Sequence, residues 1–394
     1  MIKKAGIFVL LAALFLVLLC PALVQAQGKI EILYSSVLVE FPSELNFSMS
    51  AESDVDITDI RLRYSVDHES FAEVTSEVYI EFVPDNTVGV RGALDMRKMG
   101  GLPPGSSLDY WWVVENADGE KVQTTPARVQ FDDNRYLWRS LTEGQVTIYW
   151  YEGEQSFAEE LMLAAQQALT RLADETGAYL RKPVKMYIYA DSQDLQGAMI
   201  FPQEWTGGVA FTRYGIIAIG IGPSNLLWGE RSIAHELSHL VVHQMTFNPY
   251  IALPTWLDEG LAMYTEGTLS AGFVDYVTKA IEENGLISVR SLSSPFSAYS
   301  SQATLSYAES YSVVEFLITS YGQDKMLELL TTFSEGSSYD GALERVYGFD
   351  MDGLDALWRD YVAEHYQKAG VTAESAPGSG VSEEVVYNSR FTHF

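Results

Sequence analysis

Three side chains in one short stretch, His235, Glu236 and His239, have the types and the spacing that metal-dependent hydrolysis needs. On a helix, residues four apart share one face and lie about 6 Å apart along the axis, so both imidazoles can bind one metal ion. Two neutral imidazoles and a carboxylate leave one position of a tetrahedral zinc ion open for a water molecule. Glu236, turned about 100° away from His235, can reach that water and act as general base. The stretch therefore predicts a hydrolytic zinc site.

The neighbouring residues predict that this site lies on a mostly buried helix. Arg231-Ser232 offers a polar helix start and Asn248-Pro249 a stop. Apolar residues recur between them at helical spacing, namely Ile233, Ala234, Leu237, Leu240 and Val241. The alternative is that both histidines are ordinary core or surface residues and Glu236 a solvated charge. Burial of three unpaired polar groups would be costly, which favours the metal site.

Glu259, twenty residues after His239, lies in the run Trp256-Leu-Asp-Glu-Gly-Leu-Ala262. Together with the His-Glu-Leu-Ser-His stretch, this run resembles the gluzincin metallopeptidases, in particular the aminopeptidase-N-like branch and its bacterial peptidase MA-like relatives. The resemblance covers roughly residues 140 to 368. It implies that Glu259 is the third zinc ligand, with Asp258 standing where the family has Asn. The alternative for Glu259 is an acidic residue that only balances a helix dipole.

The resemblance also implies a tyrosine that stabilises the oxyanion, in a Tyr-x-x-Gly pattern that opens a helix. Tyr307-Ala-Glu-Ser310 fits this pattern with Ser for Gly, so Tyr307 is the candidate and Tyr311 the fallback. The remaining histidines, which are His68, His243, His365 and His393, include no obvious alternative donor. Both tyrosines could instead be aromatic packing residues.

His243 extends the series of histidines along the same helix, but it should not bind the same ion. Eight residues of helix rise about 12 Å, which is too far for two ligands of one zinc. A supporting or packing role is expected for His243.

The sequence departs from the aminopeptidase pattern in one place. That branch has a Gly-x-Met-Glu-Asn strand whose Glu holds the free amino terminus of the substrate, whereas the corresponding stretch here, Gly207 to Phe211, has no Glu. An edge strand can still pair with a peptide backbone without that anchor. We therefore expect an endopeptidase that acts on peptide or protein substrates.

The first 26 residues predict a secretory signal peptide and hence a secreted or extracytoplasmic protein. Lys3-Lys4 precede an apolar stretch from Ile7 to Leu19, and Val24-Gln25-Ala26 forms a small-residue cleavage site. Lipidation at Cys20 is a less favoured alternative. Because Cys20 is the only cysteine, a chain cut near Gln27 has no disulfide.

Composition limits the partners of the protein. The 394 residues contain 53 acidic and 25 basic side chains, a formal charge of −28, which argues against binding to nucleic acid or to anionic membranes. No later segment approaches the ~18 uninterrupted apolar residues that a membrane span requires.

The hydrophobic pattern changes along the chain and predicts an α+β organisation. We expect a signal peptide at 1–26, an all-β sandwich of the immunoglobulin or fibronectin type at 27–133, a metallopeptidase domain at 134–369 and a disordered tail at 370–394. The sandwich should bind an extracellular partner or act as a spacer. The peptidase domain should combine a small β-sheet with helices and a lower helical subdomain, with strands at 146–151, 184–190 and 208–221 and helices at 156–176, 257–268, 270–284, 306–321, 323–334, 339–347 and 353–368.

Two functions remain open from the sequence. The first is a secreted zinc endopeptidase, and the second is a non-catalytic extracellular binding protein that retains the peptidase frame as a scaffold. The complete ligand set and the retention of Glu236 favour the enzyme.

Overall fold

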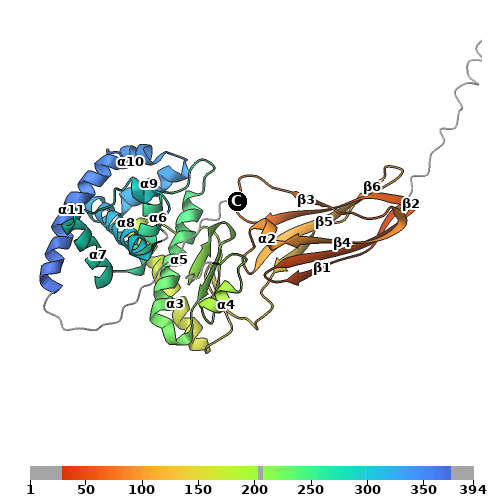
Figure 1. The fold of residues 1–394 in the computed structure, drawn as a ribbon, viewed down its shortest axis with the longest axis horizontal. Helices are drawn as coiled ribbons and strands as arrows, with labels where there is room; N and C mark the ends of the chain where they lie inside the picture. The colour runs from red at the N-terminus through yellow and green to blue at the C-terminus, as the bar shows by residue number, and fades with distance from the viewer. Residues whose placement is uncertain (1–28, 203–206, 298, 374–394) are drawn as a thin grey trace, which may run out of the picture.

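The computed structural model describes residues 29–202, 207–297 and 299–373. Figure 1 shows an elongated β-rich region at one end of the molecule and a rounded region of mixed sheet and helices at the other. The predicted signal peptide (1–26) and most of the predicted tail (374–394) lie outside the described residues. Mixed α and β structure agrees with the predicted α+β class.

The β-rich region is organised around one very long strand, β2 (Glu44–Asp67). Its pairing changes at a register shift between Glu52 and Ile57: the first half pairs with β1 and β4, and the second with β3 and β5. The other elements are β1 (Ile30–Glu40), β3 (Ser76–Tyr79), β4 (Asp85–Asp95), the short helix α2 (Met96–Met99), β5 (Ser106–Asn116), β6 (Lys121–Gln123) and β7 (Ala127–Phe131). All seven strands belong to one hydrogen-bonded antiparallel sheet, so the expected immunoglobulin or fibronectin-type sandwich stays a prediction.

A second sheet of five strands carries the site-bearing helices. Its order is β11 (Gly208–Phe211), β12 (Ile216–Gly220), β10 (Val184–Tyr189), β9 (Val146–Trp150) and β8 (Arg139–Glu143). The three central strands are parallel, and both edge strands are antiparallel to their neighbours. The predicted β-α-β run is present, with α3 (Gln155–Thr176) between β9 and β10, and α4 (Ser192–Gln196) follows β10.

The two faces of this second sheet belong to different cores. Along β10, Met186 and Ile188 pack into the core formed with the helices, whereas Tyr187 and Tyr189 pack into the core of the β-rich region. Alternating side chains of a strand point to opposite faces, which explains this division. The second sheet therefore lies between the helices and the β-rich region and joins them.

The remaining elements are helices, of which α6 to α11 form the rounded part on the left of Figure 1. They are η1 (Thr212–Tyr214), η2 (Pro223–Asn225), α5 (Leu226–Thr246), α6 (Thr255–Glu266), α7 (Ala271–Glu282), η3 (Ser291–Ser293), α8 (Ser300–Tyr321), α9 (Gln323–Ser334), α10 (Tyr339–Tyr347) and α11 (Met351–Ala373). None of the helices within the described ranges is long and apolar enough to cross a bilayer.

Two predicted helix starts need correction. Helix α5 begins at Leu226 rather than near Arg231, because Pro223 opens a 3₁₀ turn that leads directly into it. Helix α8 begins at Ser300, so Tyr307 lies inside the helix and does not open it. Its N-cap, Tyr299, makes no side-chain capping bond, which leaves the true start without a sequence signal.

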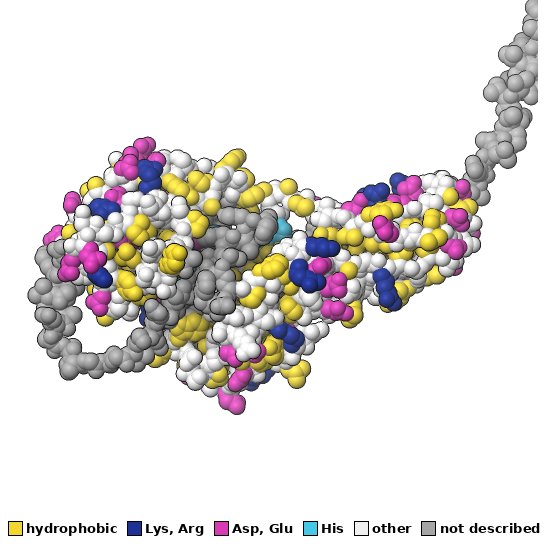
Figure 2. Space-filling model, in the orientation of Figure 1, with side chains coloured by type: hydrophobic (Ala, Val, Ile, Leu, Met, Phe, Trp, Pro, Cys, Tyr) yellow, Lys and Arg dark blue, Asp and Glu magenta, His cyan; other side chains and the backbone are white. Residues whose placement is uncertain are grey.

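Charged side chains are distributed over both regions. Figure 2 shows acidic and basic residues intermixed on the face in view, with apolar side chains scattered between them. This face has no broad cationic patch of the kind that tracks a phosphate backbone.

Candidate metal centre

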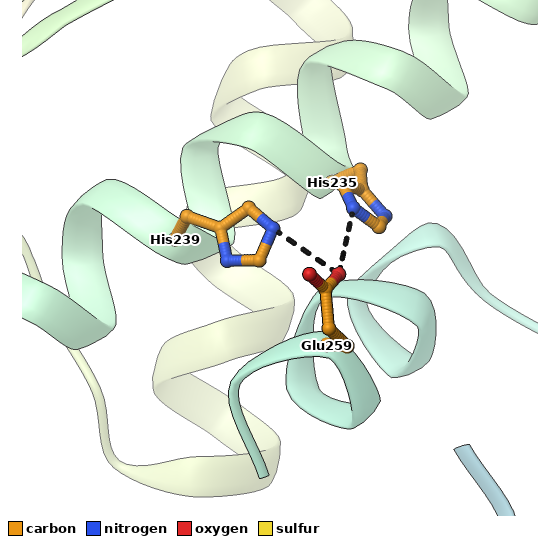
Figure 3. Close-up of side chains that lie close together, drawn as sticks. All are labelled: His235, His239 and Glu259. Atoms are coloured by element: carbon orange, nitrogen blue, oxygen red, sulfur yellow. Dashed lines mark ion pairs between the residues drawn. The ribbon is translucent and has the colours of Figure 1, made fainter. Parts of the chain in front are cut away.

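Two adjacent helices bring the three predicted ligands together. His235 and His239 lie one turn apart on α5, and Glu259 lies on α6, which packs beside it (Figure 3). The Nε2 atoms of His235 and His239 lie 3.5 and 3.6 Å from Oε2 of Glu259. The three residues are buried. Among the described residues they are the one group of His, Cys, Asp or Glu side chains whose ligand atoms lie close enough together to hold a metal ion. The spacing on α5 and the packing of α6 thus produce the arrangement that the sequence predicted.

A second set of carboxylates orients both imidazoles. Nδ1 of His235 lies 2.8 Å from Oε1 of Glu266, and Nδ1 of His239 lies 2.9 Å from Oδ1 of Asp258. A carboxylate accepts the Nδ1 proton and so fixes the tautomer that leaves Nε2 available as a metal ligand. Both rings therefore present Nε2 to the position that Glu259 faces.

The donor set fits zinc. With bonds of about 2.0 to 2.2 Å, two ligands of a tetrahedral zinc ion lie about 3.4 Å apart, close to the observed 3.5 and 3.6 Å. These separations are too long for good hydrogen bonds. Nε2 of His239 is also buried without a hydrogen-bond partner among the described residues, as is Oε2 of Glu236. An ion bound by the three ligands would satisfy Nε2 of His239, and Glu236 would face a water at that ion; burial of both groups is otherwise costly.

The electrostatics of the site also favour a cation. Glu236, Asp258, Glu259 and Glu266 are all buried close to the two imidazoles, and Arg231 is paired with Glu266. Burial acts to lower the pKa of His235, but the neighbouring carboxylates of Glu259 and Glu266 outweigh it and raise that pKa to about 10. Several carboxylates around the two imidazoles create the negative field in which a dication is stable.

Glu236 is positioned as a base next to the ligand group. It follows His235 on α5 and is fully buried, and burial raises the pKa of its carboxyl. Strand β11 approaches it closely, because a Cβ atom added at Gly208 would lie only 2.8 Å from Oε1 of Glu236. The backbone of an edge strand therefore runs directly past the proposed base.

His243 is placed behind the ligands, as the helical rise predicts. Its Nε2 lies 3.1 Å from Oδ2 of Asp258, whose other oxygen contacts His239. Burial acts to raise the pKa of Asp258, but the two imidazoles hold it well below its usual range. Asp258 is thus a buried carboxylate shared between a ligand and a second histidine.

The structure separates the environments of the two candidate tyrosines. Tyr307 is buried, with its ring edge-on to Phe296 at 5.1 Å between centroids. Burial and the Glu315 carboxylate raise the pKa of Tyr311, and its hydroxyl accepts a hydrogen bond from the backbone of Leu269. This contact gives Tyr311 a structural role, so Tyr307 stays the candidate oxyanion donor.

Sequence reasoning missed the partners of the histidines. Glu266 lies seven residues, or two helical turns, after Glu259 and therefore on the same face of α6, which is a signal that the spacing offered. The sequence marks Asp258 only as the residue that stands where the family has Asn. The role of Gly208 depends on how β11 packs against α5, which has no local signal.

Comparison with known families identifies the chain. The family model described as Peptidase MA superfamily matches residues 164–364, slightly more than half of the chain, and the matched segment contains the whole ligand group. The chain therefore belongs to the Peptidase MA superfamily. No curated protein matches the sequence.

Several solved structures are weakly similar to this chain. An M1 zinc metallopeptidase from Deinococcus radiodurans is 12% identical over 84% of this chain and 93% of that chain, with a TM-score of 0.37. Legionella pneumophila aminopeptidase A, in complex with aspartic acid, is 11% identical over 84% of this chain and 50% of that chain, with a TM-score of 0.38.

A third similar structure, catalytically inactive OgpA from Akkermansia muciniphila with an O-glycopeptide substrate, is 10% identical over 27% of this chain, with a TM-score of 0.21. The aligned part spans 30% of the length of that protein. These likenesses are too weak to assign an activity, and the family match carries the assignment.

Proposed function

We propose that this member of the Peptidase MA superfamily is a zinc-dependent metallopeptidase that hydrolyses peptide bonds within a chain. The single observation that carries the proposal is the convergence of His235, His239 and Glu259 at the distances of one tetrahedral ion, with Glu236 beside them. A scaffold that only binds a partner needs neither the ligands nor the base.

Each residue of the chain has a distinct role in this proposal. His235, His239 and Glu259 would hold the zinc ion, which supplies Lewis acidity and lowers the pKa of a coordinated water when bound. Glu236 takes a proton from the attacking water and passes it to the leaving amine. Its raised pKa suits this role, because a base must release the proton again near neutral pH.

Tyr307 is proposed to donate a hydrogen bond to the oxyanion that forms during attack. A Tyr307→Phe variant should then lose turnover by roughly 100-fold while KM changes little, since the hydroxyl acts on the transition state. Tyr311→Phe is the matched control on the same helix. An equal loss in both variants would argue against an oxyanion role specific to Tyr307.

Strand β11 supports substrate binding in an extended conformation. Among the strands that the structure describes it pairs only with β12 and so is an edge of the second sheet, and its Gly208 lies against Glu236. A peptide that adds to this edge would bring its backbone close to the proposed base. Because residues 207–211 contain no acidic side chain, no anchor for a free amino terminus is expected here, which supports cleavage within a chain.

The setting of the enzyme is proposed from the sequence. A leader at 1–26 directs the protein out of the cytoplasm, and lipidation at Cys20 is a less favoured variant of the same route. We propose that residues 27–133 form a separate β-domain that can contact an extracellular partner and that 134–369 form the peptidase domain. The overall charge of −28 opposes nucleic-acid binding.

The first experiment compares the wild-type protein with Glu236→Gln. We expect both proteins to bind about one zinc ion per chain, and only the wild type to cleave casein in a reaction that a chelator abolishes. Stoichiometric zinc without proteolysis in the wild type would favour the non-catalytic scaffold. Unchanged proteolysis in Glu236→Gln would show that another group is the base.

A peptide-library digest distinguishes the mode of cleavage. Peptides blocked at the amino terminus should be cut at internal bonds, and sequencing the products reads the preference on both sides of the bond. Cleavage restricted to unblocked peptides, one residue at a time, would show an aminopeptidase.

A further inference from the structure

A pocket of about 290 Å³ lies where the β-rich region meets the second sheet, apart from the ligand group. One wall comes from the β-rich region, with Asp67 to Glu69 and Gly105 to Ser107. The other comes from the starts of β10 and β12 and from η1, with Lys182, Pro183, Lys185 and Thr212 to Ile216. A molecule in this pocket would contact both regions at once.

The pocket gathers basic side chains in a strongly acidic protein. Lys182, Lys185 and Arg213 line it, together with the acidic residues Asp67 and Glu69. The acidic groups are already engaged: Glu69 pairs with Lys182 at 2.5 Å, and Asp67 pairs with Arg128 outside this pocket. Their negative charge is therefore offset locally.

Lys185 is the cation that these pairs do not neutralise. Its side chain is partly buried, and its Nζ donates one hydrogen bond to the carbonyl of Gly105 at 3.0 Å. Within the described ranges no carboxylate lies within ion-pair distance of it, although the charge of Asp132 is near enough to interact with it. An ammonium group has three donors, so a partly desolvated lysine with one neutral acceptor can accommodate an anion.

Arg213, on η1, lies in the same wall as Lys185 and bonds across the pocket to the β-rich region. Its Nε donates to the carbonyl of Glu69 at 3.0 Å, and the backbone N–H of Glu69 donates to the carbonyl of Arg213 at 2.7 Å. The bond from Nε, with a 3.4 Å contact between Nη2 and Nδ1 of His68, holds the side chain among the residues that line the pocket. Ser107 and Thr212 add hydroxyl groups to the lining, and such donors suit carboxylate or phosphate oxygens.

We propose that this pocket binds a small oxyanion with carboxylate or phosphate groups, held by Lys185 and Arg213 between the β-rich region and the second sheet. The site does not depend on the proposed peptidase activity. Its nearest link to the ligand group is Gln244 on α5, five residues or about 7.5 Å of helix beyond His239. Because the ligand would bridge the two regions, binding should stabilise the folded chain as a whole.

The test is calorimetric titration of the full chain with inorganic phosphate and, separately, with citrate, at constant ionic strength set by chloride. Saturable binding of either probe, with a rise in melting temperature over the same concentrations, is the expected result. The probe that binds more tightly identifies phosphate or carboxylate as the preferred group. The absence of saturable binding of both probes up to about 10 mM would overturn the proposal.

Variants then locate the site. Lys185→Met should weaken binding at least about tenfold, whereas Lys185→Arg should retain most of it. Lys121→Met is the matched control, because Lys121 pairs with Glu115 on the β-rich region and does not line the pocket. Equal affinity of Lys185→Met and the wild type would refute the assignment, and Arg213→Gln, which removes the other proposed contact, answers the same question if the Met variant does not fold.

Discussion

Zinc affinity after substitution of Glu259 or its neighbour Asp258 gives the sharpest test of the metal centre. The two carboxylates are adjacent on α6 and equally buried, but only Glu259 faces both Nε2 atoms, while Asp258 contacts Nδ1 of His239 and Nε2 of His243. The structure therefore assigns them different roles. Glu259 is a ligand and Asp258 is a group that orients a ligand.

The expected losses follow from these roles. Binding of structural zinc is worth about 10 to 16 kcal/mol over four ligands, so loss of Glu259 in Glu259→Ala should cost about 2.5 to 4 kcal/mol, or roughly 70- to 900-fold in affinity. Removal of an orienting partner costs roughly 10- to 100-fold, which is the range expected for Asp258→Ala. Asp258→Asn keeps one oxygen that can accept the Nδ1 proton of His239, so its loss of zinc affinity should be about 10-fold or less.

The assay is competition for zinc against a fluorescent chelator at neutral pH, with the melting temperature of each metal-free variant as a control for folding. Glu259→Ala should release zinc at a much lower chelator concentration than Asp258→Ala, with Asp258→Asn closest to the wild type. Equal losses in the two alanine variants would refute the choice of Glu259 as third ligand.

Three further predictions test the surroundings of the site. Zinc affinity should rise with pH, by up to about tenfold per unit, because the raised pKa of His235 means that the ion must displace a proton; a pH-independent affinity would contradict this. Gly208→Ala should lower kcat without loss of zinc, since its Cβ would lie 2.8 Å from Oε1 of Glu236; an unchanged kcat would place β11 away from the base. Burial raises the pKa of Glu309 to about 8, so its contribution to the free energy of unfolding is full below the unfolded pKa near 4.5 and is lost as pH rises through 8. In urea denaturation between pH 5 and 8, the free energy of unfolding should fall less steeply with pH for Glu309→Gln than for the wild type. The same pH dependence in both proteins would exclude the effect.

The predictable parts of the site are the residues whose positions relative to one another follow from their spacing within one helix. His235 and His239 are one turn apart on a helix, so their convergence follows from helical geometry before any tertiary structure is known. Helix α6 follows Pro254, which marks its start, and carries Glu259 in its first turns. The identity of the orienting carboxylates depends on the rotation of α6 against α5, which no local pattern states.

Strands β4 and β8 lack a strong periodic pattern in their own sequences. Strand β4 has glycines at positions 89 and 92 among its few apolar residues, and β8 contains a single apolar residue, Leu141. The first half of β2 does alternate, with Leu45, Phe47, Met49 and Ala51 buried. Polar residues between Glu52 and Ile57 interrupt this alternation, so the sequence does not predict that both halves form one strand. Pairing with neighbours stabilises these strands more than their own sequence does.

The boundary between the two regions illustrates a further limit of sequence reasoning. A change of texture after Asp133 suggests a boundary along the chain, yet the side chain of Asp133 is buried and pairs with Arg135, and Tyr189 from β10 donates to it at 3.0 Å. The aromatic residues Tyr187 and Tyr189 lie in the core of the β-rich region while their neighbours along β10 lie in the helical core. Removal of the β-rich region would expose this aromatic face of the second sheet to water. The β-rich region therefore supports the sheet against which α5 holds the metal centre, in addition to any role it has in binding a partner.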